Sequence, residues 1–499
     1  MKPPVGLLLF LAVLFTMHLA FGQVPPLAWV QRYPEGGYVV NAFVAADRDN
    51  NVVVVDAVNG LTTIKYSNNG VPLWTNYFNG GFSGFWPLAM TVDGSNNIVV
   101  GGGCQVSSGY NCFTIEYAST GQPRWTNYYA GNSPSTTLNL VQALTVDSSN
   151  NVVITGSSGV YPSFFNCFTI KYSLTGAPLW TNNVSVPSSW CSGYAVATDS
   201  NNNVFVGGVV SYNGAVVKYS SDGVPVWTNI SPISVSDSAG VSFQILAIDG
   251  SNNVFSDSFQ PYYTSNDGMN HYYVTKYSNS GTIVWNQDFG YTNGDGYLAP
   301  FYPPSLAVDK NGNAFLVGSG RSTDSFVIKY SSAGLPLWTN IYPGTYQLEN
   351  SHPLIVDRGN NLIISGYANN GATGNDYLTV KYSGTGVPVW TNLYDGSGNG
   401  DDQATSLSLD QVGNVYVTGS SWNGANYDLT TIKYLVSQLP IPLFLQKKNN
   451  QMVLSWSNAA FSLQSAPTPN GTFTNLTGVT SPYTNPITGS QRFFRLIAN

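Results

Sequence analysis

The chain has 499 residues and a net charge of −7, with charged residues at 9% and aromatic residues at 14% of the total. This composition is typical of extracellular β proteins, whose surfaces rely on Asn, Ser, Thr, Gly and Tyr, and unlike that of helical cytosolic enzymes. Because Lys and Arg form no basic stripe that could follow a phosphate backbone, the sequence excludes nucleic acid as a partner. The length allows several average domains or one large repeat array.

Residues 1–22 have the pattern of a signal peptide. Lys2 supplies the positive charge, Val5 to Leu19 is almost continuously apolar, and Ala20-Phe21-Gly22 offers small residues for cleavage before Gln23. An uncleaved membrane anchor is the alternative, but the apolar run is short for a span, and no later segment is long and apolar enough for one. We therefore expect a secreted or cell-surface protein without a transmembrane segment after cleavage.

Four cysteines lie within one stretch of the chain, and export permits them to form disulfides. We favour Cys104 with Cys112 inside one hairpin and Cys167 with Cys191 across adjacent repeats. Free buried thiols are the alternative. A metal site is not expected, because no C-x-x-C spacing occurs and no His lies nearby.

An internal repeat covers most of the chain, and it is marked by three residue types at fixed positions. We number its copies repeats 1 to 8. A Lys-Tyr pair or close variant ends a β-rich run at Tyr66, Tyr117, Tyr172, Tyr219, Tyr277, Tyr330, Tyr382 and Tyr434. An Asp opens a turn earlier in each copy, at Asp47, Asp93, Asp147, Asp199, Asp249, Asp309, Asp357 and Asp410. A Trp follows each of the first seven Tyr, at Trp74, Trp125, Trp180, Trp227, Trp285, Trp338 and Trp390.

Each copy reads as four short strands. In repeat 3 we expect them at Gln142 to Val146, Val152 to Gly156, Phe168 to Tyr172 and Leu179 to Asn182. The Asp accepts backbone bonds in the first turn, and the Asn or Gly near its end tolerates positive φ. A calcium loop is the weaker reading, because one carboxylate followed by amides is a poor ligand set. Such repeats predict the blades of an all-β propeller, with the Trp residues packed between neighbouring blades.

The ends of the array predict how the ring closes. No Trp follows Tyr434 at the expected distance, whereas Trp29 precedes the first Asp turn. An N-terminal strand that completes the last blade explains both facts and removes an exposed sheet edge. We therefore predict an eight-bladed propeller over residues 23–436, with seven blades as the alternative.

Composition changes after the last repeat. We predict a linker at residues 437–442 and a small β module at 443–499, which acts either in surface attachment or as a cap on the propeller. Its closing Arg492-Phe-Phe-Arg-Leu496 resembles a C-terminal module of secreted proteins from some environmental bacteria.

The last repeat carries the family resemblance. Ala404 to Tyr434, with Asp410-Gln-Val-Gly-Asn-Val-Tyr-Val-Thr-Gly and Thr431-Ile-Lys-Tyr434, resembles the bacterial β-propeller repeat family named SBBP. The resemblance extends over about residues 27–434 and supports the fold. It implies little about activity, since members are mostly secreted or surface proteins of unassigned function.

The connections that vary between repeats are the expected place for a ligand, because variable loops on a rigid scaffold usually carry binding. The longest are Asp257 to Tyr273 and Asp288 to Pro304. Their aromatic and polar side chains suit a glycan or protein ligand, and mutual packing of the tyrosines is the alternative. The candidate ligand-binding residues are Tyr262, Tyr263, His271, Tyr272, Tyr291, Asp295, Tyr297 and Tyr302.

No complete catalytic constellation appears. The chain lacks a G-x-S-x-G elbow, a His cluster and a phosphate-binding Gly loop. Carboxylates that could cleave glycosides are Asp257, Asp295, Glu349 and Asp402. The loop from Asp395 to Asp402 resembles a calcium loop but lacks its closing Glu, so we interpret it as a capped loop and predict no metal.

Asp324, Asp376 and Asp428 recur at one position before the repeat Tyr, which indicates structural caps. We predict a monomeric binding or scaffold protein without a cofactor. A carboxylate-dependent carbohydrate hydrolase and a purely structural surface component are the alternatives.

Overall fold

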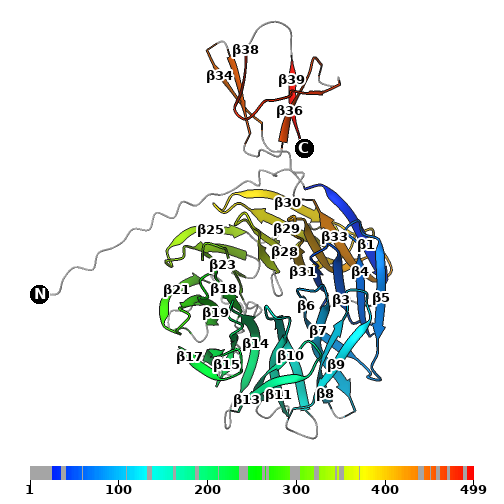
Figure 1. Ribbon diagram of the computed structural model, residues 1–499, viewed down its shortest axis with the longest axis vertical. Coiled ribbons are helices and arrows are strands. Elements are labelled where there is room, and N and C mark those ends of the chain that lie inside the picture. The colour runs from blue at the N-terminus through cyan, green and yellow to red at the C-terminus, as the bar shows by residue number, and fades with distance from the viewer. Residues whose placement is uncertain are drawn as a thin grey trace, which may run out of the picture.

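The computed structural model describes most of the chain. The described residues are 25–34, 37, 41–58, 60–107, 109–131, 137–160, 165–185, 190–211, 213–234, 245–260, 265, 269–292, 304–319, 325–342, 346–347, 353–369, 371, 373–435, 443–449, 451–456, 461–468, 472–486 and 492–498. Their regular structure consists of β-strands alone, and no helix among them could cross a membrane. Figure 1 shows that the strands of the repeats form a ring, with the strands of the C-terminal segment beside it.

The strands of each repeat follow one another in sequence. Repeats 1 to 4 contain β2 (Phe43–Ala46), β3 (Val52–Asp56), β4 (Leu61–Tyr66), β5 (Pro72–Phe78), β6 (Phe85–Val92), β7 (Ile98–Val106), β8 (Gly109–Tyr117), β9 (Pro123–Tyr129), β10 (Thr137–Val146), β11 (Val152–Val160), β12 (Phe165–Tyr172), β13 (Pro178–Val184), β14 (Cys191–Thr198), β15 (Val204–Val210), β16 (Asn213–Tyr219) and β17 (Pro225–Ser234). Repeats 5 to 8 contain β18 (Leu246–Ile248), β19 (Val254–Gln260), β20 (Met269–Tyr277), β21 (Ile283–Thr292), β22 (Ser305–Val308), β23 (Ala314–Ser319), β24 (Ser325–Tyr330), β25 (Pro336–Tyr342), β26 (Tyr346–Gln347), β27 (Leu354–Val356), β28 (Leu362–Asn369), β29 (Asn375–Tyr382), β30 (Pro388–Tyr394), β31 (Asp402–Leu409), β32 (Val415–Trp422) and β33 (Tyr427–Tyr434).

Each repeat folds into an antiparallel meander. In the described residues most meanders are separate four-stranded sheets, and β26 adds a short strand to repeat 7. Repeats 2 and 3 share one sheet because Leu138 forms a single parallel pair with Tyr110. The predicted all-β propeller is confirmed by this arrangement, while the number of blades stays a prediction.

The N-terminal strand completes the last repeat, as predicted. Strand β1 (Leu27–Pro34) runs antiparallel to β33, with Trp29 opposite Lys433 and Tyr33 opposite Leu429. The resulting sheet has the order β1-β33-β32-β31. Residues from the two ends of the array therefore share one sheet, so that backbone hydrogen bonds hold the ring closed.

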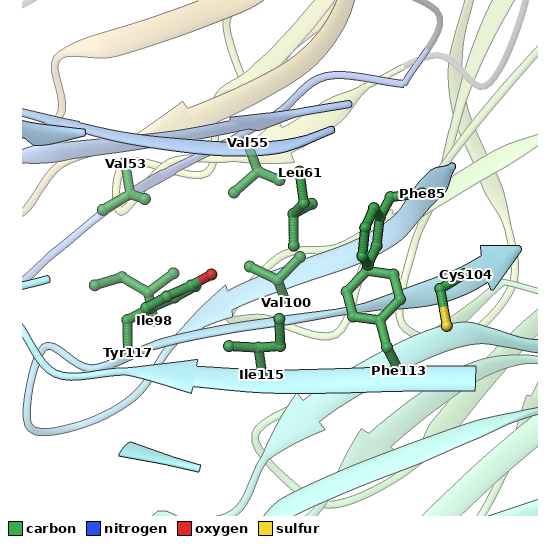
Figure 2. Packing of buried hydrophobic residues seen from close by; sticks show 10 residues of the cluster. All are labelled: Val53, Val55, Leu61, Phe85, Ile98, Val100, Cys104, Phe113, Ile115 and Tyr117. Carbon is green, nitrogen blue, oxygen red and sulfur yellow. The ribbon is translucent and has the colours of Figure 1, made fainter. Parts of the chain in front are cut away.

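The hydrophobic core lies between neighbouring repeats. Figure 2 shows Val53, Val55 and Leu61 of repeat 1 facing Val100 and Phe113 of repeat 2. A central strand of a blade has a neighbouring repeat on both faces, which explains why Val52 to Val55 are all fully buried rather than alternating with exposed residues.

The C-terminal segment forms two small sheets with a core of its own. One has the order β34-β35-β38 and the other β37-β36-β39. Leu454, Trp456 and Leu463 are buried between them. The strands are β34 (Phe444–Lys448), β35 (Gln451–Ser455), β36 (Phe461–Ala466), β37 (Thr474–Asn475), β38 (Tyr483–Pro486) and β39 (Phe493–Ala498). The domain boundaries stay a prediction.

One of the two predicted disulfides is present. Cys167 and Cys191 are bonded, with their Cα atoms 5.0 Å apart. The predicted Cys104–Cys112 bond is wrong, because both thiols are free and buried. Cys112 lies opposite Gly103 in the β7–β8 ladder, so it faces the side of the sheet away from Cys104. Burial raises the pKa of the Cys104 thiol to about 11.

Candidate functional site

The propeller has two chemically different ends. In each meander the Asp turn joins the first two strands, and the turn after Lys-Tyr joins the last two. Both turns lie at one end of an antiparallel repeat, which we name the Asp-turn end. The remaining connections lie at the opposite end, which we name the variable end.

The Asp turn of repeat 3 shows how its carboxylate is used. Asp147 Oδ1 accepts hydrogen bonds from the backbone N–H groups of Ser149 and Asn151, each at 2.9 Å. Asn150 between them has a φ of 61°, which Asn tolerates better than most residues. Asp147 Oδ2 lies 2.9 Å from Lys171 Nζ. Burial opposes ionisation, but the bonds from Asn151 and Lys171 lower the pKa of Asp147 below its ordinary value.

A buried ion pair between this Asp and the Lys of Lys-Tyr recurs around the ring. The sequence interpretation assigned the Asp to its turn and missed the Lys, although both occur at a constant position in the repeat. The Nζ–Oδ2 distances are 2.8 Å for Lys65–Asp47, 3.9 Å for Lys218–Asp199, 3.3 Å for Lys276–Asp249, 3.2 Å for Lys329–Asp309 and 2.7 Å for Lys381–Asp357. Repeat 2 differs, because Glu116 replaces the Lys and pairs with Arg124.

The repeated Trp joins each repeat to the next, as predicted. Trp180 Nε1 donates to the Ser221 carbonyl at 3.1 Å, and Lys171 Nζ donates to the same oxygen at 3.2 Å. The indole lies against Gly223, where a Cβ atom would come within 2.7 Å of the ring. Asn182 Nδ2 also donates to the Gly223 carbonyl, at 2.7 Å. The indole therefore packs against the neighbouring repeat and is not a free sugar platform.

The turn amides form a belt of hydrogen bonds between repeats, which we name the Asn belt. In repeats 1 to 5 the Asn at positive φ accepts a bond from the backbone N–H that follows the Asp of the preceding repeat. The bonds are Gln411 N to Asn50 Oδ1 at 2.9 Å, Arg48 N to Asn96 Oδ1 at 2.9 Å, Gly94 N to Asn150 Oδ1 at 2.9 Å, Ser148 N to Asn202 Oδ1 at 3.0 Å and Ser200 N to Asn252 Oδ1 at 3.4 Å. Repeats 6 and 8 have Gly at this position, and between repeats 7 and 8 Arg358 Nη2 donates instead to Gln411 Oε1 at 2.6 Å.

A hollow of about 310 Å³ lies at the Asp-turn end, against repeats 1, 2, 3 and 8. Its lining includes Arg48, Asp93, Asp147, Asn150 and Gln411. Each of these residues except Arg48 holds its turn or the Asn belt through its side chain. The polar groups of this end are thus mostly engaged within the scaffold.

At the variable end, repeat 5 carries the most distinctive described side chains. His271 Nδ1 lies 2.9 Å from Asp288 Oδ1, and its ring stacks on Tyr273 with centroids 5.9 Å apart. Tyr273 donates its hydroxyl to Gln260 Oε1 at 3.0 Å. Alternation along the strands brings these side chains from β19, β20 and β21 to one face of the sheet. The Asp288 side chain is 44% exposed, so the pair can meet a ligand.

The other predicted ligand contacts divide into two groups. Tyr272 is 2% exposed and packs against Phe259 and Phe326, so in this structure it belongs to the core. The backbone of Tyr291 lies in β21, whereas its side chain is outside the described part of the chain. Also outside the described residues are Tyr262, Tyr263, Asp295, Tyr297 and Tyr302, together with Asp324 and Glu349.

A second polar group lies at the variable end where repeats 7 and 8 meet. One carboxylate oxygen from each of Asp376, Asp395 and Asp402 lies within 4.8 Å of the other two. Among the described residues, this is the one group of Asp, Glu, His or Cys side chains close enough together to hold a metal ion. Asp402 Oδ2 accepts the Gly396 N–H at 2.6 Å, and its Oδ1 accepts the Trp422 N–H at 3.0 Å. Burial raises the pKa of Asp402 despite these bonds, and the Asp395 charge raises it further.

Neighbouring side chains support this acidic group. Asp376 accepts the Thr373 hydroxyl at 3.1 Å, and Asp428 lies 3.4 Å from Arg32 Nη1; their role as caps stays a prediction. Arg32 Nη2 also donates to the Tyr394 hydroxyl at 3.0 Å. The sequence interpretation singled out the loop from Asp395 to Asp402, but only the β1–β33 pairing brings Arg32 to it.

Two other acidic side chains are buried in the sheets with no cation beside them among the described residues. Asp56 ends β3 at the variable end, and Asp257 lies in the middle of β19; within the same residues the Oδ2 atom of each has no hydrogen-bond partner. Burial raises the pKa of Asp56 to about 6 and that of Asp257 well above its ordinary value. Asp257 is fully buried, so the predicted hydrolytic carboxylate is inaccessible in this structure.

Comparison with known proteins supports the fold. Residues 390–428 match the family model of the SBBP beta-propeller repeat. A solved structure titled "Structure of Dos1 propeller" has 10% sequence identity and a TM-score of 0.52, with 82% of this chain and 94% of that chain covered. A crystal structure of Saccharomyces cerevisiae Sqt1 has 10% identity and a TM-score of 0.49, with 83% and 99% covered.

No curated protein matches the chain. The family match agrees with the resemblance found in the last repeat, and the likeness to the Dos1 propeller concerns the fold alone. We conclude that the chain has a β-propeller fold and that its residues 390–428 match the SBBP beta-propeller repeat.

Proposed function

We propose that the protein is an exported binding or scaffold protein whose ligand, a glycan or another protein, contacts the variable end of the propeller. The β-propeller fold suggests a binding or scaffold role in general. The proposed location of the ligand rests on the chemical difference between the two ends of the propeller. The repeated Asp, Lys, Trp and Asn side chains hold the ring together, which leaves the residues that do not repeat for a specific ligand.

The long connections of repeats 5 and 6 are the proposed contact region. His271 and Asp288 are polar groups of this region that the structure positions on one sheet face. The predicted contacts Tyr262, Tyr263 and Tyr297 belong to the same two connections. Aromatic rings beside such polar groups can stack on a sugar or peptide and hydrogen-bond to it.

A glycan array and a pull-down with the chain lacking its predicted signal peptide test the proposal. We expect a specific ligand whose binding falls at least tenfold when Tyr262, Tyr263 and Tyr297 are replaced together by Ala. Arg48→Ala, at the Asp-turn end, is the matched control and should bind normally. Equal loss in both variants, or binding unaffected by the triple variant, would contradict the location. A chain that binds no partner supports the structural-component alternative.

The carboxylates between repeats 7 and 8 give the hydrolase alternative a definite form. Asp395 is the exposed carboxylate of this group and the one that a substrate would reach, whereas Asp402 beside it has a raised pKa but is fully buried in this structure. A screen with polysaccharide substrates tests this alternative. Turnover that disappears in Asp395→Asn supports it, and turnover that survives in both Asp395→Asn and Asp402→Asn rules it out.

A further inference from the structure

The charges of this chain are divided unevenly between the propeller and the C-terminal segment. All 25 Asp and Glu residues occur between Glu35 and Asp428. Residues 443–499 contain none, but they include four cations, namely Lys447, Lys448, Arg492 and Arg495. This segment therefore has a net charge of +4, whereas residues 23–442 contain 13 Lys and Arg and have a net charge of −12.

The basic segment also has an exposed edge. Strand β34 is an outer strand of its three-stranded sheet, and all five of its residues are exposed. Phe444 is 60% exposed and Leu445 64%, and Lys447 and Lys448 follow them in the same strand. Figure 1 shows β34 on the side of this segment away from β36 and β39. Strand alternation puts Phe444 and Lys448 on one face of β34 and Leu445 and Lys447 on the other, so each face of this edge strand carries one apolar and one cationic side chain.

The other two cations lie on the second sheet. Arg495 Nε donates to Gln464 Oε1 at 2.8 Å, and its guanidinium lies 4.3 Å from the centroid of the Phe473 ring. Arg492 is exposed just before β39. Since residues 443–499 contain no Asp or Glu, none of these four cations has an acidic side chain of the same segment as its counter-charge.

We infer that residues 443–499 form a docking surface for anionic phospholipid, with β34 as the contact strand. With β34 edge-on to the membrane, Lys447 and Lys448 would lie among the phosphate groups, while Phe444 and Leu445 would enter the interface on opposite faces of the strand. This combination of adjacent cations with exposed apolar side chains is how peripheral proteins bind acidic membranes. Each Lys near such a surface adds attraction, which salt weakens within a Debye length.

Two other anionic occupants fit the observations less well. The propeller of a second copy offers fewer free charges than its sequence suggests, because 13 of the 25 Asp and Glu side chains are buried. An acidic polysaccharide would satisfy the lysines but would gain little from the aliphatic side chain of Leu445. Binding to an anionic lipid interface would be favoured by both the lysines and the exposed apolar side chains.

Vesicle sedimentation tests the inference with the chain lacking its predicted signal peptide. Vesicles of 70% phosphatidylcholine and 30% phosphatidylglycerol are compared with pure phosphatidylcholine at low salt. We expect roughly tenfold or more preference for the anionic vesicles, and loss of that preference in Lys447→Glu/Lys448→Glu, which reduces the charge of the segment to zero. Phe444→Ser/Leu445→Ser should weaken binding to the anionic vesicles severalfold, while the dependence of binding on salt concentration stays the same.

The matched controls are Lys310→Glu and Leu335→Ser/Leu337→Ser, which change exposed residues of the propeller. Both should bind like the unchanged chain, and circular dichroism verifies that each variant is folded. Equal binding to both vesicle types, or full binding by the Lys447→Glu/Lys448→Glu variant, would overturn the inference. Sedimentation without vesicles, or displacement from vesicles by polygalacturonate at equal charge concentration, would instead assign the surface to a second copy or to an acidic polysaccharide.

Discussion

The two ends of the propeller use polar side chains in opposite ways. At the Asp-turn end, repeated carboxylates, ammonium groups and amides satisfy one another within and between repeats. At the variable end, Asp56 is buried with no cation beside it among the described residues, and three carboxylates crowd together between repeats 7 and 8. The satisfied polar groups of the Asp-turn end stabilise the ring, whereas the buried and crowded carboxylates lower the free energy of unfolding. Natural proteins tolerate such a cost mainly where function requires it, so the contrast points to the variable end.

The strongest test of the Asp-turn end removes a buried ammonium group. We expect Lys171→Met to lower the free energy of unfolding by about 3–5 kcal/mol, because Asp147 would keep its charge without a counter-charge. Urea denaturation measures the change. Lys310→Met is the control, since Lys310 is exposed and should lose less than about 1 kcal/mol. Similar losses in the two variants would show that the buried pair does not stabilise the ring.

The variable end should respond in the opposite direction. Asp56→Asn removes a carboxyl with a folded-state pKa of about 6, and should raise the free energy of unfolding at pH 7.5 by up to about 3 kcal/mol. As pH rises from about 4 to 6, the unfolded chain loses this proton first, so the unchanged protein loses stability over that range. Thermal melts at pH 4.5 and 7.5 should show the gap between variant and unchanged protein widening with pH. A constant gap would show that Asp56 is not buried as a neutral acid.

The Asn belt offers a finer test, because one of its members makes a bond that another lacks. Asn150 and Asn360 both have a φ of 61°, but Asn150 Oδ1 accepts the Gly94 N–H whereas Asn360 Oδ1 has no partner in the part of the chain that the structure describes. We expect Asn150→Ala to destabilise the protein by about 1 kcal/mol more than Asn360→Ala. Equal melting temperatures for the two variants would show that the Asn belt does not help to hold neighbouring repeats together.

The smallest effect on stability is expected where we place the ligand. Asp288 is partly exposed, so Asp288→Asn should change the free energy of unfolding by less than about 1 kcal/mol. The same variant should weaken ligand binding if His271 and Asp288 contact the ligand. Chemical denaturation and a binding assay on one preparation compare the two effects. A large loss of stability would place this pair with the scaffold.

Sequence periodicity was sufficient to predict the fold, because the Asp, Trp and Lys-Tyr positions recur in every repeat or nearly so. It also placed Trp29 with the last repeat, which the pairing with β33 confirms. The Lys–Asp pairs and the Asn belt were missed because their partners are separated along the chain and meet only across a sheet or between repeats. The error at Cys104 and Cys112 has a similar origin, since their spacing is short but their register turns them to opposite faces.

The candidate site was harder to predict, because the residues that matter there do not repeat. Asp402 was identified as a carboxylate, but its proximity to Asp376 and Asp395 depends on how repeats 7 and 8 pack. Tyr272 was predicted to contact a ligand because the residues around it resemble a loop. It lies in strand β20 instead, and strand alternation directs its side chain into the core beside Phe326.

The pairing of β1 with β33 also sets an order of events during synthesis. Trp29 is translated about 400 residues before Lys433, its partner in the ladder. Repeats 1 to 7 can form their own meanders from local contacts, but β1 has no edge to join until the last repeat exists, and such distant pairings form slowly. Strand β1, the first strand of the ring to be made, is therefore the last strand of the ring to find its partner.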